Sequence, residues 1–68
     1  RAAEKEISAI DRRLEKIQGE IAGVDAQLAD AHDDFERLMG LQRRRDELVA
    51  ETATLEERWL ELGEAIDG

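Results

Sequence analysis

The sequence predicts an all-α protein, built as a two-helix antiparallel coiled-coil hairpin. Three observations support this fold class: apolar residues recur at heptad spacing in both halves, that spacing changes phase near the middle, and the 68 residues contain no Pro. Alternating steps of three and four residues place apolar side chains along a narrow seam, as in a left-handed supercoil. Without Pro, each half can continue as one unbroken helix.

The first helix is expected over about residues 2–30, and the second over about residues 34–67, within a single unit that covers residues 1–68. The apolar seam of the first helix is formed by Ile7, Ile10, Leu14, Ile17, Ile21, Val24 and Leu28, with Ala3 one step earlier. The seam of the second is formed by Leu38, Leu41, Leu48, Leu55, Trp59, Leu62 and Ile66.

Two polar residues, Arg45 and Thr52, interrupt the second seam. We interpret them as devices that fix the register, with the Arg45 stem packed in the seam and its guanidinium reaching water. The alternative is that a loosened seam exposes them for binding.

A turn at residues 31–33 separates the helices. Asp33 and Glu36 form a D-x-x-E pattern, which is typical of a helix N-terminal capping box. A turn this short makes neighbouring helices antiparallel. Phe35 and Met39 lie off the seam next to this turn, and we expect them to cap the hairpin or, alternatively, to form an apolar tip. Gly68 follows the last periodic residue and is expected to end the second helix.

Charge selects the register of the two helices. One alignment gives three pairs of opposite charge: Glu6 with Arg58, Arg13 with Glu51, and Glu20 with Arg44. Sliding one helix by a heptad instead places Arg13 against Arg58 and Glu20 against Glu51. We therefore expect the first alignment, in which Ala3 faces Trp59 and Ile17 faces Arg45.

Composition limits the function. Eighteen Asp and Glu against ten Lys and Arg give a net charge of −8, which opposes nucleic-acid binding through bulk charge. No apolar run approaches a membrane span, so we expect no membrane contact. A two-helix coil has no pocket for catalysis, and one histidine, His32, beside flexible Asp side chains makes a poor metal site. We expect no catalytic residue, cofactor or metal in this chain.

The segments E-E-R-W-L-E-L (Glu56–Leu62), D-D-F-E-R-L (Asp33–Leu38) and R-A-A-E-K-E-I (Arg1–Ile7) together resemble the C-terminal coiled-coil domain of bacterial ABC-F ATPases of the Uup branch. This resemblance implies a cytoplasmic parent protein with duplicated cassettes that bind ATP and Mg²⁺. It implies a non-catalytic arm that contacts DNA or the ribosome, or regulates the cassettes. The alternatives are a structural spacer or dimerisation module, and the arm of an RNA-handling enzyme such as a tRNA synthetase.

Two groups of residues are candidates for contact. Basic residues gather half-way along both helices and are expected to form a girdle that binds phosphate: Arg12, Arg13, Lys16, Arg43 and Arg44. The alternative for these residues is ordinary pairing with nearby carboxylates. Trp59 and Leu60 are candidates for protein contact, because Trp is a common interface anchor and Leu60 lies outside the seam. We expect a monomer or a weak homodimer.

Overall fold

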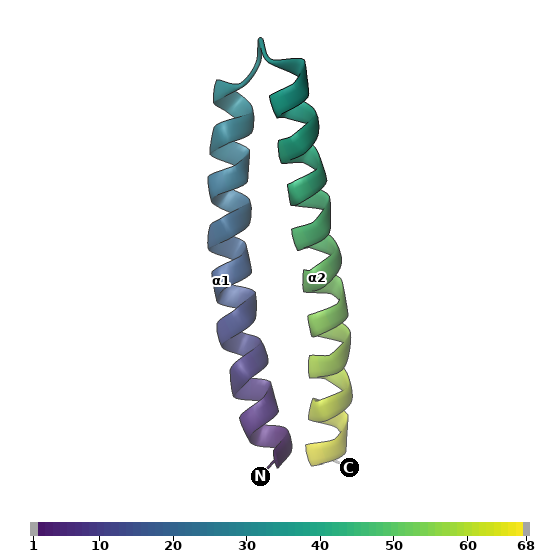
Figure 1. Cartoon of the computed structure of the whole chain (residues 1–68). Coiled ribbons are helices and arrows are strands. Elements are labelled where there is room, and N and C mark those ends of the chain that lie inside the picture. Colours follow the sequence, from purple (N-terminus) through teal and green to yellow (C-terminus); the bar gives the residue numbers. More distant parts are fainter. Residues whose placement is uncertain (1, 68) are drawn as a thin grey trace.

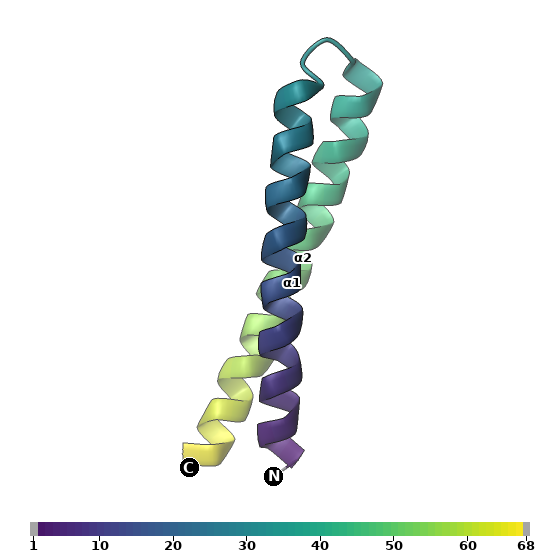
Figure 2. The ribbon, with the colours of Figure 1, turned by 90° about the vertical axis from the view of Figure 1, so that its left-hand side faces the viewer.

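The computed structural model describes residues 2–67, which form two helices, α1 (Ala2–Asp30) and α2 (Phe35–Asp67). The helices run antiparallel, a short turn joins them, and both chain ends lie at the same end of the molecule (Figure 1). The helices cross when seen from the side (Figure 2), as expected for helices that pack with an inclined seam. The Cα atoms extend over 52 Å along the hairpin and 14 Å across it. The predicted all-α hairpin is confirmed.

The core of the hairpin is a single line of seam residues. Ile17 on α1 and Leu48 on α2 are fully enclosed, with no exposed surface, and Val24 is buried beside them. Four half-buried residues pack against this centre: Ile21, Leu28, Leu41 and Leu55. All of these residues occupy predicted seam positions, so the heptad reading of both helices is correct.

Both polar residues in the seam have hydrogen-bond partners. Arg45 is half-buried, and its Nε donates to Asp25 Oδ1 at 2.7 Å, so the guanidinium leaves the seam towards α1. The Thr52 hydroxyl donates to the Leu48 carbonyl oxygen at 2.9 Å, which satisfies it within its own helix. The seam therefore carries two polar residues without leaving a buried side-chain donor or acceptor unpaired in the described part of the chain.

The start of α2 differs from the prediction. The N-cap is Asp34 rather than Asp33: Asp34 Oδ1 accepts a hydrogen bond from the Arg37 backbone N–H at 3.1 Å. The Asp34 carbonyl oxygen also accepts the first helical bond, from Leu38 N–H at 2.9 Å. The turn needs this extra residue because the Asp34 N–H donates to the Ala31 carbonyl oxygen at 3.0 Å, while the Ala31 side chain is buried. The predicted helix stop at Gly68 lies outside the described residues.

The two ends of the seam are less covered than its middle. Phe35 is 75% exposed and Met39 is also exposed, so the prediction that they cap the hairpin is wrong, and Ala31 fills that place instead. At the other end, Trp59 is 40% exposed and Ile66 is exposed, although both are at seam positions. The register explains the exposure of Ile66, which extends past the level where α1 begins at Ala2. The contact of Trp59 with Ala3 stays a prediction.

Replacement of Leu48 by Ala tests the position of the core. A fully buried Leu truncated to Ala is expected to lower the free energy of unfolding by about 2–5 kcal/mol. Leu60→Ala removes the same atoms from an exposed site on the same helix and should change it by about 0.5 kcal/mol or less. Urea unfolding followed by circular dichroism compares the two variants. Equal destabilisation by both would show that the seam is placed wrongly.

Candidate interaction surfaces

One flank of the hairpin is closed by a ladder of ion pairs between the helices. Arg13 makes two hydrogen bonds to Glu51, from Nε at 2.6 Å and from Nη2 at 2.9 Å. Arg58 Nε donates to Glu6 Oε2 at 2.8 Å, and Arg44 Nη2 donates to Glu20 Oε2 at 3.2 Å. These are the three pairs that the sequence predicts, so the predicted register is confirmed.

The ladder lowers the pKa of two of its carboxylates, those of Glu6 and Glu51. The hydrogen bonds from Arg13 hold the pKa of Glu51 below its usual value of 4.5, and the hydrogen bonds from Arg58 do the same to the pKa of Glu6. In both cases the charged form is favoured in the folded hairpin. The ladder therefore stabilises the fold as long as both carboxylates are ionised.

The predicted basic girdle is not one free surface. Arg13 and Arg44 are committed to Glu51 and Glu20, and Arg44 Nη1 also lies 3.6 Å from Glu47 Oε2. The side chains of Arg12, Lys16 and Arg43 make no ion pair within residues 2–67. Arg12 and Arg43 both occupy the heptad position opposite the seam, so they point away from each other on opposite sides of the hairpin.

The outer face of α1 keeps a shorter row of unpaired cations. Lys5, Arg12 and Lys16 are seven and four residues apart, which places them on one face of a helix. The remaining residues of this face are small up to the last turn of α1: Ala9, Gly19, Gly23 and Ala26. Nothing lies within 4 Å of the place where a side chain would start on Gly19 or Gly23. Lys5 was not among the predicted basic residues, although its spacing of seven residues from Arg12 indicates a shared helix face.

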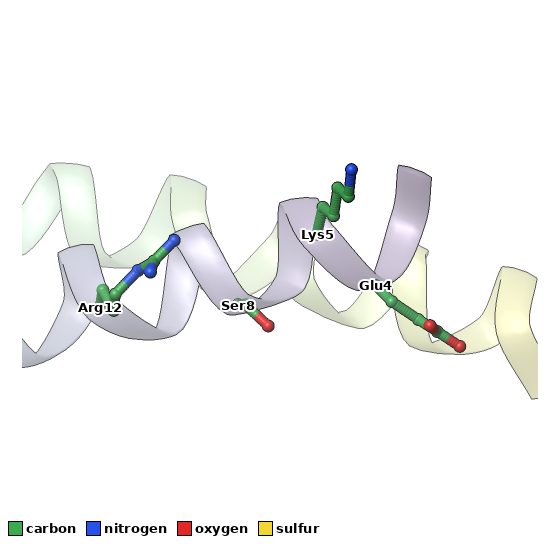
Figure 3. A pocket seen from close by; sticks show the side chains of 4 residues that line it. All are labelled: Glu4, Lys5, Ser8 and Arg12. Atoms are coloured by element: carbon green, nitrogen blue, oxygen red, sulfur yellow. The ribbon is translucent and has the colours of Figure 1, made fainter. Parts of the chain in front are cut away.

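A shallow depression lies along the start of α1, lined by Glu4, Lys5, Ser8 and Arg12. Lys5 and Arg12 point to one side of the helix, whereas Glu4 and Ser8 point to the other (Figure 3). The four side chains do not converge on a common point, so this depression does not assemble an acid, a base and a nucleophile around a substrate.

The turn also lacks a convergent metal site. His32 Nδ1 lies 3.3 Å from the Ala29 carbonyl oxygen, and His32 Nε2 lies 3.5 Å from Asp33 Oδ2. Within residues 2–67, no three histidine or carboxylate side chains are grouped closely enough to hold a metal ion.

The candidate contact residues Trp59 and Leu60 lie near the open end of the hairpin, where the chain ends are. Leu60 is 58% exposed, and Trp59 and Ile66 are also exposed on the same helix. These three side chains give the open end an apolar character, in contrast to the charged flank next to it. Trp combines a large apolar surface with an N–H donor, which suits it to an interface.

The fold is a coiled-coil hairpin, and its candidate contact sites lie on exposed helix faces rather than in an enclosed cleft. The family model of the ABC transporter C-terminal domain matches residues 1–64, and the chain belongs to this family. Comparisons with curated proteins and with solved structures give no match. Neither described helix has the length and apolar character needed to cross a membrane.

The ion-pair ladder predicts a pH-dependent effect of Glu51→Gln. Because the folded pKa of Glu51 is lowered, its stabilisation is fully present above about pH 4.5 and is lost as the pH falls through the folded pKa. The variant should therefore melt at a lower temperature than the parent chain at pH 7, and this difference should shrink as the pH is lowered from 4.5 towards 3. Thermal unfolding followed by circular dichroism at these pH values measures it.

Glu57→Gln is the matched control, since Glu57 is exposed on the same helix and has no ion pair within residues 2–67. It should not lower the melting temperature at pH 7. A Glu51→Gln deficit that persists unchanged at pH 3 would contradict the role of the Arg13–Glu51 pair.

Proposed function

We propose that this chain is the non-catalytic C-terminal arm of an ABC-F ATPase in the cytoplasm, and that it regulates the ATP-binding cassettes by docking on them through its open end. The observation that carries the proposal is the exposed apolar group of Trp59, Leu60 and Ile66 at the end where both chain ends lie. The membership of an ABC C-terminal domain family supports it, since cassettes would precede such a domain in the parent protein. ATP and Mg²⁺ would be bound by those cassettes.

The geometry favours the open end over the rest of the surface for this contact. A parent chain that continues from residue 1 brings its preceding domain close to this end, so the contact needs little ordering of a linker. Trp59 and Ile66 are seam residues left without full cover, and burying them against a cassette would complete the seam. The gain in buried apolar surface provides the driving force for docking.

Trp59→Ala tests this contact. The hairpin is titrated by calorimetry onto the parent protein truncated before the arm, and ATP turnover is measured with and without added hairpin. Loss of an interface anchor should weaken binding about tenfold or more and reduce the effect on turnover. Thr54→Ala, an exposed residue of α2 on the side away from Trp59, should leave both unchanged.

Circular dichroism of Trp59→Ala confirms that the hairpin remains folded before binding is compared. Undiminished binding of the variant would remove Trp59 from the contact. Absence of binding by the unaltered hairpin would contradict cassette docking and favour the alternative of a structural spacer or dimerisation module.

The outer face of α1 supports a second candidate function, contact with DNA or with ribosomal RNA. Lys5, Arg12 and Lys16 extend over about 17 Å of this face at 1.5 Å per residue. The neighbouring small residues would let a phosphate backbone approach the helix closely. Arg13, Arg44 and Arg43, by contrast, do not join this surface, because the first two are in ion pairs and the third lies on the far side.

Fluorescence anisotropy of labelled duplex DNA and of structured RNA tests this second candidate. Three phosphate contacts predict that the logarithm of affinity falls with that of salt with a slope of about −2 to −3. Changing Lys5, Arg12 and Lys16 to Gln should abolish binding, whereas Arg43→Gln should not. Failure of the unaltered chain to bind at low salt would exclude direct nucleic-acid contact by the hairpin.

A further inference from the structure

The large exposed apolar side chains of α2 outside the seam lie on one line. Phe35, Met39, Val49 and Leu60 are all exposed, and their spacing follows steps of three and four residues through Gln42, Asp46, Ala53 and Glu56. We call the apolar members of this line, Phe35, Met39, Val49, Ala53 and Leu60, the flank stripe. A second heptad line on a helix that already has a seam is typical of a helix with two packing faces.

The flank stripe lies on the side of the hairpin opposite the ion-pair ladder. The ladder residues Arg44, Glu51 and Arg58 each directly precede a seam position, which places them on one side of the seam. The stripe residues directly follow seam positions, which places them on the other side. From Phe35 to Leu60 the stripe extends for about 38 Å at 1.5 Å per residue. It is therefore a long, narrow line of apolar side chains, interrupted by Gln42, Asp46 and Glu56, and its apolar members are exposed.

The border of the flank stripe is acidic, and in the described part of the chain its carboxylates lack ion-pair partners except for Asp25, which pairs with Arg45. Asp46 and Glu56 lie within the same line on α2, and Glu4 and Asp11 lie on the edge of α1 that faces it. The register places Asp11 within about one helical turn of Val49 along the hairpin. All four are exposed, and none of them makes an ion pair within residues 2–67. On the opposite flank, by contrast, Glu6, Glu20 and Glu51 are each paired with an Arg.

From this arrangement we propose that the flank stripe docks a basic amphipathic helix of a partner protein. The apolar face of such a helix covers the stripe, and its Lys and Arg side chains pair with Glu4, Asp11, Asp46 and Glu56. A helix that lies against two others in this way is the common helix-in-groove mode of recognition. Charge complementarity at the border also steers association and selects the partner.

A second copy of the chain fits this surface less well. Each copy carries a net charge of −8, and stripe-to-stripe packing brings the unpaired carboxylates of both copies together. Juxtaposed like charges at an interface are costly, so the surface selects against itself. This surface shares Leu60 with the open end, but Phe35, Met39 and Val49 do not belong to the open end, so variants at these three positions test the stripe separately.

The test uses the complete chain and a labelled synthetic peptide of about 25 residues, long enough to cover the stripe. The peptide has a Leu heptad face with Lys and Arg on its edges, and a scrambled peptide of the same composition serves as its control. Anisotropy titration should show binding of the amphipathic peptide about tenfold or more tighter than that of the scrambled one. Equal binding of both would reduce the interaction to unspecific charge attraction and overturn the proposal.

Val49→Glu and Ala50→Glu form a matched pair of variants. Both add one carboxylate to adjacent exposed positions of α2, but only Val49 belongs to the stripe. Val49→Glu should weaken peptide binding about tenfold despite the added attraction to a basic peptide, whereas Ala50→Glu should not weaken it. The double variant Phe35→Ala/Met39→Ala should also weaken binding without altering charge or fold, because both side chains are exposed. Unchanged binding in these stripe variants would overturn the proposal.

Sedimentation equilibrium of the chain without peptide decides between the two occupants. A monomer that binds the amphipathic peptide supports the proposal. A dimer that Val49→Glu converts to monomer would instead assign the stripe to a second copy, and so overturn the proposal of a basic partner.

Discussion

The pairing of Arg13 with Glu51 fixes a choice that the apolar seam leaves open. A heptad line of Ile and Leu looks almost the same after a shift of seven residues, so burial alone fits several registers nearly equally well. The bidentate pair between Arg13 and Glu51 stands in the middle of the ladder, with the Glu6–Arg58 and Glu20–Arg44 pairs on either side. A slide of one heptad would turn two of these attractions into repulsions. The position of every other feature follows from the register that they fix.

Among these features are the partners of the two polar seam residues. In this register Arg45 reaches Asp25 on α1, while Thr52 donates a hydrogen bond within its own helix. The register also determines which surfaces stay open. One flank is neutralised by Arg–Glu pairs, whereas the other keeps unpaired carboxylates beside the flank stripe. The hairpin thus has two chemically different flanks although its seam is a simple repeat.

The fold was predictable from local sequence pattern. The seam, the short turn and the pairs of opposite charge all depend on the spacing of residues along the two helices. The seam residues Ile17 and Leu48 and the three ladder pairs followed from spacing alone. The cap at Asp34 did not, because two adjacent Asp residues offer the same side chain and only the path of the turn decides between them. The exposure of Trp59 was also not predictable from spacing, because Trp59 occupies a seam position and is nevertheless 40% exposed.

The candidate surfaces were harder to predict for a different reason. Sequence proximity gathered the basic residues into one group, but a helix distributes neighbours around its axis, and the ion-pair ladder neutralises Arg13 and Arg44. Lys5 shares a face with Arg12, while Arg43 points to the other side of the hairpin. The flank stripe was not predicted, because its members are separated by Gln42, Asp46 and Glu56, which interrupt the apolar pattern.

The ladder also bears on the order in which the two helices pair during folding. The Glu20–Arg44 pair closes a loop of moderate length around the turn, whereas the Glu6–Arg58 pair joins residues 52 positions apart in the chain. Chain closure costs more entropy for the distant pair, so pairing that starts near the turn and advances towards the chain ends meets the lowest barrier at each step. The open end is then the last part to zip and the first to fray. The single Trp of the chain lies there, so its fluorescence reports the opening of that end rather than the unfolding of the core around Ile17 and Leu48.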